Sequence, residues 1–339
     1  MKIAIQHREG SFSGRWIEYC KKKNLDYVLI DCFKSDILNI FRKEKITHLM
    51  WHLNHASSKD LMVYPYVMNT AEIMGIKTFP NFSTRWHFDD KVAQKYLFES
   101  IGAPLVKSVV FYEENEALAF LESAQLPLVA KLKRGAGSTN VKLINSQTEG
   151  SEYIKKLFSV GIVSTASALG NLDQKLRVAK QIKDPIKLVK KTIGFLKKNR
   201  REQTLANSEK GYVYFQEFMP NNDFDIRIIV VGDIAFGIRR FNKENDFRAS
   251  GSGKLDFDVS QIDIETVKIA FDVTKKIGGQ CLAFDFVYDA NKQPKIVEVC
   301  FGFSMKAYDV CPGYWKSDLS FVEGTFNPQE FMMENFLNE

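Results

Sequence analysis

The sequence predicts an α/β protein whose second half is α+β: an open parallel sheet comes first, and two mixed α+β units follow. Three observations support this. The first 80 residues alternate short apolar runs with amphipathic segments, the pattern of β–α–β units in a parallel sheet. Later segments pair as hairpins around short turns. The 339 residues are enough for about two or three domains.

Apolar and turn patterns place the elements of the first region in order. The expected strands are Ile3–Gln6, Tyr27–Asp31 and His48–Leu53. Helices are expected from near Ser13, from near Ser35, and over Met68–Met74 before Gly75. The segment Thr78–Asn81 is rich in turn residues, and a long helix pattern then covers Asp89–Ile101 and ends at Gly102.

The second half is richer in strands. Further strands are expected at Ser108–Phe111, Leu128–Leu132, Val141–Ile144, Tyr212–Phe218, Asp225–Val231, Ile234–Phe241, Ala283–Tyr288 and Lys295–Cys300. Helices are expected over 151–210 and over Ile264–Ile277. We expect three regions: 1–85, 86–215 with a helical insertion at 151–210, and 216–339.

Composition excludes several classes of protein. Hydrophobic residues make up 45% and charged residues 26%, values that argue against disorder, collagen-like repeats and a coiled coil. No apolar run approaches the roughly 20 residues that span a bilayer. The first residues lead into a polar segment rather than a signal-peptide core. The five cysteines lack paired spacing, so we expect reduced thiols, no structural zinc and a cytoplasmic protein.

The net charge of +6 is concentrated in one segment. Residues 151–210 contain 14 Lys or Arg against 5 Asp or Glu, and the rest of the chain contains 33 against 36. A positive charge confined in this way argues against a nucleic-acid partner for the whole protein. A solvated Lys-rich helix face explains the segment, and contact with an anionic membrane or a phosphorylated substrate is the alternative.

One hairpin brings two acidic residues together. Closing its turn on Asn291 and Lys292 places Asp285 opposite Glu298. Directly opposed like charges destabilise a sheet, so this pair needs a cation or a shared proton. Two carboxylates with waters and phosphates form a Mg²⁺ site; a solvated or Lys-neutralised pair is the alternative. The side chains expected to point into the core are Phe284, Phe286, Val297 and Val299.

A second hairpin turns on Gly232 and Asp233 and pairs Asp225 with Arg240, with Arg227 on the same face. A half-exposed sheet with an ion pair explains this pattern.

The segment Val129–Val141 is a third chemical feature. It carries Lys131 on a strand and then a Gly-rich loop. The backbone N–H groups of such a loop can approach phosphates, and the Lys ammonium adds a positive charge. The spacing matches neither a P-loop nor a dinucleotide-binding fingerprint.

The order of these motifs, from about Thr78 to Glu298, resembles the ATP-grasp superfamily, and within it the ribosomal-protein glutamate ligases and related amino-acid ligases. The resemblance implies an ATP-grasp fold that grips ATP between two α+β subdomains behind an N-terminal parallel sheet. The motifs that carry it are Phe88-Asp-Asp-Lys91, Lys131 with the Gly-rich loop, Gln216-Glu-Phe-Met-Pro220, Asp225-Ile-Arg227, Asp246-Phe-Arg248, and Asp285 with Glu298.

The resemblance also implies roles for these residues. The phosphate-binding residues would be Lys91, Lys131, Gly135, Gly137 and Ser138. The adenine hinge would be Glu217, Phe218 and Met219, with Asp225 at the ribose. The catalytic residues would be Arg227 and Arg248, with Arg248 near the γ-phosphate and the acyl phosphate, and Mg²⁺ would bind Asp285 and Glu298.

One position departs from the family pattern. The family usually ends this motif Glu-x-Asn, and the Asn is a ligand of a second metal, but this chain has Cys300. A thiol is a poor Mg²⁺ ligand, so the second metal is in doubt.

The implied chemistry is carboxylate activation by ATP and Mg²⁺ through an acyl phosphate, followed by attack of an amine. The partners would be a small carboxylate and a small amine, and the resemblance leaves the oligomeric state open. A small-molecule kinase and a non-catalytic ATP-binding regulatory protein are the alternative functions.

The substrate side is less defined by the sequence. A loop after the first strand contains Arg8 and Ser11, and it lies at the carboxyl end of a parallel strand, where open α/β sheets bind ligands. We expect both residues to contact substrate. The aromatic tail, Ala307–Trp315, is expected to dock as a C-terminal cap, with a sugar or nucleotide site as the alternative. This tail also resembles those of ATP-grasp proteins associated with surface-polysaccharide synthesis.

Overall fold

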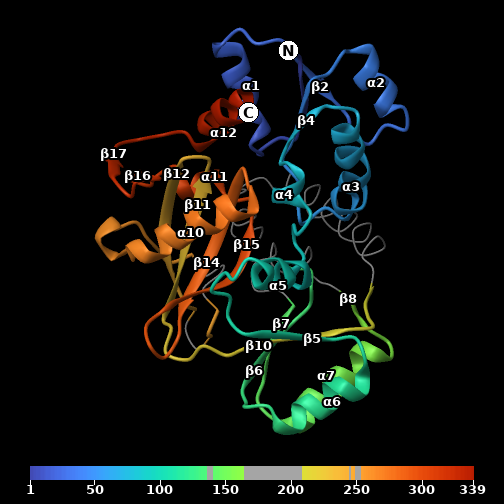
Figure 1. The fold of residues 1–339 in the computed structure, drawn as a ribbon, viewed down its shortest axis with the longest axis vertical. Coiled ribbons are helices and arrows are strands. Elements are labelled where there is room, and N and C mark those ends of the chain that lie inside the picture. Colours follow the sequence, from blue (N-terminus) through green and yellow to red (C-terminus); the bar gives the residue numbers. More distant parts are fainter. Residues whose placement is uncertain (136–139, 164–207, 244–245, 249–252) are drawn as a thin grey trace, which may run out of the picture.

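Three sheets follow one another along the chain in a computed structural model, which describes residues 1–135, 140–163, 208–243, 246–248 and 253–339 (Figure 1). The predicted helices within 164–207 lie outside the described residues. The three sheets follow the order of the three predicted regions, and the boundaries near residues 85 and 215 stay a prediction.

The first sheet is parallel, in the order β2-β1-β3-β4, as the sequence predicts. Its strands are β1 (Ile3–Gln6), β2 (Tyr27–Ile30), β3 (His48–Trp51) and β4 (Lys77–Phe79). Its helices are α1 (Ser13–Lys22), α2 (Ile37–Lys43) and α3 (Ser58–Ile73). Strand β4 was expected as a turn, and the third helix begins ten residues earlier than predicted. Ser57 caps that helix by accepting a hydrogen bond from the Asp60 N–H.

Two helices connect this sheet to the second one. They are α4 (Phe82–Arg85) and α5 (Lys91–Ser100), and Asp90 caps α5 by accepting hydrogen bonds from two backbone N–H groups. The second sheet is antiparallel, in the order β5-β10-β6-β7. Its strands are β5 (Ser108–Phe111), β6 (Leu128–Lys131), β7 (Val141–Ile144) and β10 (Val213–Glu217). Two helices cover it, α6 (Glu114–Ser123) and α7 (Gln147–Phe158). Short strands β8 (Ile162–Val163) and β9 (Ser208–Glu209) pair beside it.

The third sheet is antiparallel and has the order β15-β14-β11-β12-β16-β17, with β13 paired to β12. Its strands are β11 (Phe224–Val231), β12 (Ile234–Phe241), β13 (Leu255–Asp256), β14 (Cys281–Tyr288), β15 (Pro294–Cys300), β16 (Gly313–Lys316) and β17 (Phe321–Glu323). Helix α10 (Ile264–Ile277) packs on one face, where the buried cluster contains Ile226, Ile228, Phe284 and Phe286. A single-turn 3-10 helix, Val259–Gln261, precedes α10.

The predicted pairing of Asp285 with Glu298 is confirmed, but the turn that produces it is longer than predicted. On the turn side of Asp285 the pairing is shifted by one residue, so that Phe286 pairs with Ile296, and a bulge between Asp285 and Phe286 restores the predicted register. Because of the bulge, Ile296 takes the buried position, and Val297 lines a cavity on the opposite face instead of the core. The prediction for Val297 was therefore wrong.

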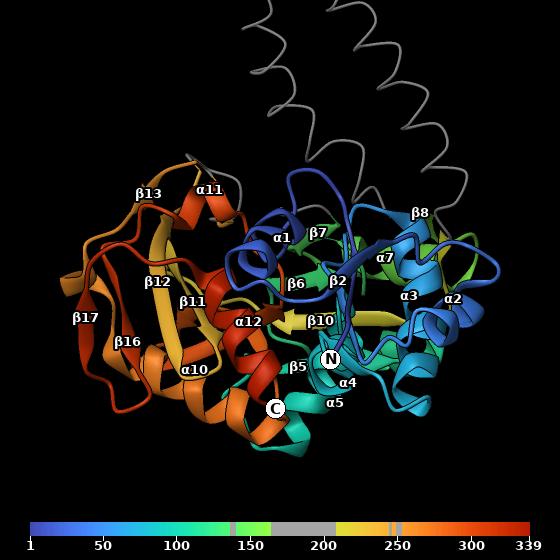
Figure 2. The same ribbon diagram turned by 90° about the horizontal axis from the view of Figure 1, so that it is seen from above.

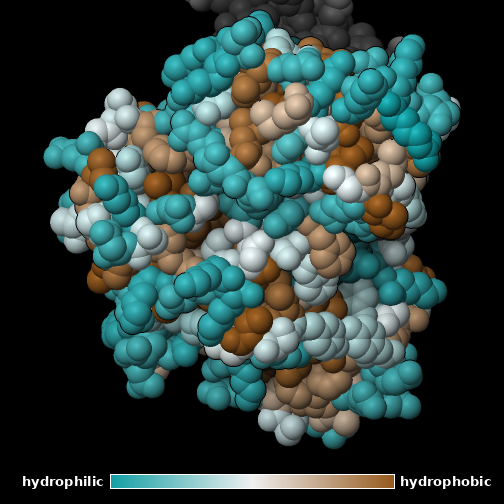
Figure 3. All heavy atoms as spheres, turned by 45° about the horizontal axis from the view of Figure 1, so that its top comes forward, coloured by the Kyte–Doolittle hydropathy of each residue, from teal (hydrophilic) through white to brown (hydrophobic). Residues whose placement is uncertain are grey.

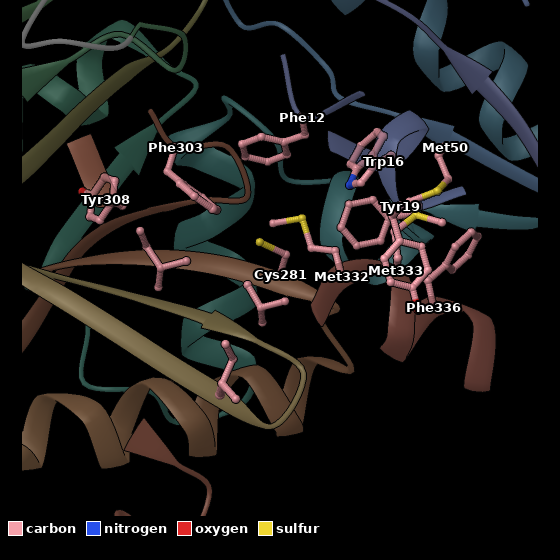
Figure 4. Packing of buried hydrophobic residues seen from close by; sticks show 14 of the residues in the cluster. Phe12, Trp16, Tyr19, Met50, Cys281, Phe303, Tyr308, Met332, Met333 and Phe336 are labelled. Atoms are coloured by element: carbon pink, nitrogen blue, oxygen red, sulfur yellow. The ribbon is translucent and has the colours of Figure 1, made fainter. Parts of the chain in front are cut away.

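The C-terminal segment docks as a cap, as the sequence predicts for the aromatic tail. It adds α11 (Met305–Tyr308) and α12 (Pro328–Asn338), neither of which the sequence predicts, and Tyr308 and Trp315 are buried. Helix α12 lies beside α1 (Figure 2). Met333 and Phe336 share a buried cluster with Trp16 of α1 (Figure 4).

Figure 3 shows apolar and polar side chains interspersed on the face that it presents. Among the described residues, no helix combines the length and hydropathy needed to cross a membrane.

Candidate active site

A cavity between the second and third sheets brings most of the predicted site residues together. Its lining includes Lys91, Lys131, Gly135, Glu217, Phe218, Met219, Asp225, Arg248, Asp285 and Glu298. These residues come from a helix start, five strands and three loops. Gly137 and Ser138 lie outside the described residues. Arg227 donates a hydrogen bond to Asp285 but is not among the residues that line the cavity.

Lys91 joins three parts of the site. It is the first residue of α5, and its Nζ donates a hydrogen bond of 2.8 Å to the Gly135 carbonyl oxygen and lies 3.4 Å from Glu298 Oε2. Asp89 holds the same loop, because its Oδ1 accepts the Gly135 N–H at 3.0 Å. The other oxygen, Oδ2, is buried without a partner in the described part of the chain. Burial raises the pKa of Asp89 to about 6.

Lys131 is buried at the end of β6. Its Nζ donates a hydrogen bond of 2.6 Å to Gln216 Oε1, from the neighbouring strand β10. Burial lowers the pKa of Lys131 to about 8, against the opposing effect of Glu298. Gln216 in turn donates to Ser108 Oγ. The sequence reasoning included Gln216 in the hinge motif but gave it no role; its position opposite a Lys-bearing strand could only follow from knowing that β10 pairs with β6.

The two predicted metal carboxylates differ in their surroundings. Arg227 donates two hydrogen bonds to Asp285, at 2.5 and 2.9 Å, and Arg240 Nη2 lies 2.9 Å from Asp285 Oδ2. Arg240 also donates two hydrogen bonds to Asp225, at 2.6 and 2.5 Å. Burial opposes ionisation of Asp285, but the two guanidinium groups outweigh it and hold its pKa below the usual range.

This network changes two predictions. The surroundings of Asp225 are largely buried rather than a half-exposed sheet, and burial raises the pKa of this carboxyl despite Arg240. The cation that the acidic hairpin needs is supplied by Arg227 and Arg240, whereas Lys91 faces Glu298. Arg240 was predicted only as a partner of Asp225; its contact with Asp285 depends on the pairing of β11 with β14, which local spacing does not reveal.

The carboxylate pair still fits one Mg²⁺. A carboxylate offers about four lone-pair directions; Asp285 uses three, and Glu298 forms one ion pair within the described residues, with Lys91. Cys300 does not add a ligand, because burial raises its pKa to about 11 and its Sγ accepts the Gly302 N–H. No group of three His, Cys, Asp or Glu residues in the described ranges is arranged to hold a metal. A Mg²⁺ here would therefore need phosphate and water oxygens as well.

The hinge and Arg248 complete the cavity. Phe218 packs edge-on against Phe247, with ring centroids 5.6 Å apart. The Glu217 N–H donates to the Lys107 carbonyl oxygen. The Met219 N–H, by contrast, has no acceptor in the described part of the chain. Arg248 is held by Asp246, which accepts hydrogen bonds from its Nε and Nη2.

The predicted substrate residues lie apart from this cavity, on the loop after β1. Arg8 is exposed, whereas Ser11 is buried and donates a hydrogen bond of 2.7 Å to the Arg8 carbonyl oxygen. Substrate contact by either residue stays a prediction. The position of Ser11 favours a role in shaping the loop.

A parallel sheet followed by two α+β units, with two lysines, a hinge strand and paired carboxylates around one cavity, defines the class of ATP-grasp proteins. The family described as RimK-like ATP-grasp domain matches residues 133–310, more than half of the chain, and the chain belongs to this family. The predicted superfamily and fold are thereby confirmed.

Solved structures support the same fold. The chain resembles a RimK-domain ATP-grasp protein from Sphaerobacter thermophilus, with TM-score 0.55 and 12% identity over 100% of both chains. It also resembles D-alanine–D-alanine ligase from Bacillus anthracis, with TM-score 0.55 and 14% identity over 100% of this chain and 98% of that one.

A third similar structure carries nucleotide. It is the biotin carboxylase domain of the Hydrogenobacter thermophilus 2-oxoglutarate carboxylase in complex with MgADP, with TM-score 0.59 and 12% identity over 100% of this chain and 70% of that one. A sequence comparison with curated proteins finds no match for this chain.

Proposed function

We propose that this protein is an ATP-dependent ligase that joins a carboxylate to an amine through an acyl phosphate. One observation carries the proposal: a single cavity is lined by the two lysines, the hinge and the carboxylate pair that such a reaction uses. The reaction asks the protein mainly to position reactants and to neutralise phosphoryl charge. Membership of the RimK-like ATP-grasp family supports the proposal.

Each part of the cavity has a task in this proposal. The free Met219 N–H and the neighbouring Glu217 backbone suit the edge of an adenine base. Lys91 and Lys131 face the region between the Gly-rich loop and Glu298, where their ammonium groups would neutralise phosphates. Glu298 and Asp285 would hold Mg²⁺, which when bound draws charge from the phosphate oxygens.

The arginines order the reacting carboxylate. Arg227 is fixed by its two bonds to Asp285, so its remaining N–H groups point from a rigid position. Arg248 lines the cavity from a loop and is steadied by Asp246. Two cations on different elements can bind the carboxylate and the transferred phosphoryl group together, which favours attack by lowering the repulsion between two anions.

The finer assignments are part of the same proposal. We propose small-molecule acid and amine substrates, with an amino acid or amino sugar of surface-polysaccharide synthesis as one candidate pair. We also propose that the enzyme acts in the cytoplasm; the five cysteines are free thiols, which agrees with a reducing compartment.

A coupled assay tests the function. ADP and phosphate released only when both an acid and an amine are present supports the ligase. ADP formed without free phosphate instead indicates a small-molecule kinase. Tight ATP binding without turnover, over a broad panel of acids and amines, indicates a non-catalytic nucleotide-binding protein.

The basic segment 151–210 is proposed to contact an anionic membrane or a phosphorylated substrate. Its charge excess is the only support, because most of the segment lies outside the described residues. Flotation of the protein with liposomes tests the membrane contact. One set of liposomes contains zwitterionic lipid alone, and the other also contains anionic lipid, which gives the surface a negative potential. Binding that is indifferent to lipid charge and salt contradicts it.

A further inference from the structure

A polar edge of the first sheet lies outside the lining of the candidate ATP cavity and takes no part in the proposed chemistry. Strands β1 and β3 are adjacent and parallel, so the loops that follow them, residues 7–12 and 52–57, lie at the same edge. Open parallel sheets bind ligands at this carboxyl edge. The two loops contain four basic residues, His7, Arg8, His52 and His55, and one acidic residue, Glu9.

The backbone of Arg8 is held rigidly. Its N–H donates to Ser13 Oγ at 3.2 Å, and its carbonyl oxygen accepts hydrogen bonds from Ser11 Oγ at 2.7 Å and the Ser11 N–H at 3.2 Å. The side chain, in contrast, forms no hydrogen bond or ion pair with the described part of the chain. A rigid loop thus presents an exposed guanidinium that still has five N–H groups to donate.

His52 presents a donor of fixed orientation. Its ring stacks on Phe12, with centroids 3.7 Å apart, and its Nδ1 accepts the Phe12 N–H at 3.0 Å. Burial, together with the nearby Arg8 and His55, lowers the pKa of His52 to about 3. The ring is therefore neutral, with its proton on Nε2, and this N–H has no acceptor among the described residues.

Gly302 lies close to this donor. A Cβ added to Gly302 would lie 3.4 Å from His52 Nε2 and 3.9 Å from Cys300 Sγ. Gly302 follows β15, the strand that carries Glu298. His52 Nε2 therefore lies beside the segment that follows the strand of the metal carboxylates, at a residue that has no side chain to cover it.

His55 connects this edge to the reaction centre. Its pKa is lowered first by burial and then by the positive charges of Lys91, Arg227 and Arg8, and Glu298 opposes them. His55 therefore interacts electrostatically both with Arg8 and with groups of the candidate active site. Asp60 interacts electrostatically with Arg8 but forms no hydrogen bond with it; this carboxyl is buried and accepts the Asn54 N–H at 3.0 Å.

We propose that Arg8 and His52 bind a second anionic group on the acid substrate, so that the substrate is a small dianion rather than a simple monocarboxylic acid. This inference rests on the proposed function. One carboxylate would react beside Glu298, and the other end would be held by the Arg8 guanidinium and the His52 Nε2–H. A carboxylate and a phosphate share this oxyanion chemistry, so the probes must separate them.

Calorimetric titration of the full-length protein with MgADP present tests the proposal, using glutarate, 3-phosphonopropionate and valerate. We expect at least one dianion to bind about tenfold or more tightly than valerate, and the stronger of the two to identify the anionic group. Arg8→Gln should weaken dianion binding about ten- to hundredfold, the effect of losing a charge-assisted hydrogen bond. The control Arg42→Gln, an exposed arginine on α2, should leave dianion binding unchanged.

A second variant separates binding from folding. His52→Asn keeps an acceptor for the Phe12 N–H but removes the donor at the Nε2 position and the ring that stacks on Phe12. Its melting temperature is measured alongside, and the folded variant should bind the dianions more weakly than wild type. The proposal is overturned if valerate binds as tightly as the dianions, if neither dianion binds, or if Arg8→Gln weakens valerate and dianions equally. Failure of the proposed function appears separately, as absence of MgADP binding or of ATP turnover in the wild-type protein.

Discussion

The carboxyl of Asp89 allows a prediction that can be worked from the structure. Its Oδ1 fixes the Gly-rich loop through the Gly135 N–H, while its Oδ2 is buried without a partner in the described ranges. Burial raises the pKa of Asp89 from 3.8 to about 6. The replacement Asp89→Asn keeps the acceptor oxygen for Gly135 and removes the buried charge.

The direction of the pH effect on stability follows from the linkage between proton binding and folding. Well below pH 3.8 the Asp89 carboxyl is protonated in both the folded and the unfolded chain, so it does not reduce stability. As the pH rises, the unfolded chain loses the proton first, and the folded protein loses stability until the pH is well above 6. A shift of about two pKa units corresponds to roughly 3 kcal/mol, of which about 2 kcal/mol develops between pH 4.5 and pH 8.

Urea unfolding of both proteins at these two pH values measures the effect. The free energy of unfolding of Asp89→Asn relative to wild type should rise by about 2 kcal/mol from pH 4.5 to pH 8. Comparing the two pH values removes the cost of burying the Asn amide, because that cost does not depend on pH. A relative stability that is the same at both pH values would refute the argument that Asp89 is held as an unfavourable buried charge.

Three further outcomes are expected. Lys131→Met should weaken MgADP binding at least tenfold. The affinity of the wild-type protein for MgADP should fall as the pH rises through about 8, because burial lowers the pKa of Lys131 to about 8. An affinity that calorimetry finds constant from pH 7 to 9.5 would contradict this. Arg240→Met leaves Asp225 buried without its cation and should cost about 3–5 kcal/mol of stability in urea unfolding; an unchanged unfolding midpoint counts against the network. The double replacement Asp285→Ala and Glu298→Ala should abolish Mg²⁺-dependent ATP turnover, and retained turnover would remove the metal assignment.

Much of the fold follows from local patterns. The strands Ile3–Gln6, Ser108–Phe111 and Ile234–Phe241 and the helix Ile264–Ile277 have the predicted bounds, because each combines a clear apolar period with a turn or cap at its ends. The hairpin on Gly232 pairs Asp225 with Arg240 as predicted, because a two-residue turn fixes the register.

Other parts depend on contacts between distant segments. The longer turn and the bulge that move Val297 into the cavity offset one another, so spacing alone could not show them. Helix α12 has its buried side against α1, more than 300 residues away, and without that partner its pattern indicates nothing definite. The same holds for Arg227, whose bonds to Asp285 require the pairing of β11 with β14.

The loops at the carboxyl edge of the first sheet were predicted only in part. Arg8 was predicted from its place after a parallel strand. His52 and His55 were not predicted, because only the folded loop orients one imidazole nitrogen to the backbone and leaves the other free.

Trapping of the acyl phosphate tests the central claim most directly. The full-length protein is incubated with MgATP, an acid from the coupled screen and hydroxylamine, and the hydroxamate is measured against ADP. The proposed ligase should form hydroxamate in proportion to ADP, and only when ATP, Mg²⁺ and the acid are all present. ADP formed without any hydroxamate across the acids that support turnover would contradict an acyl phosphate and, with it, the proposed function.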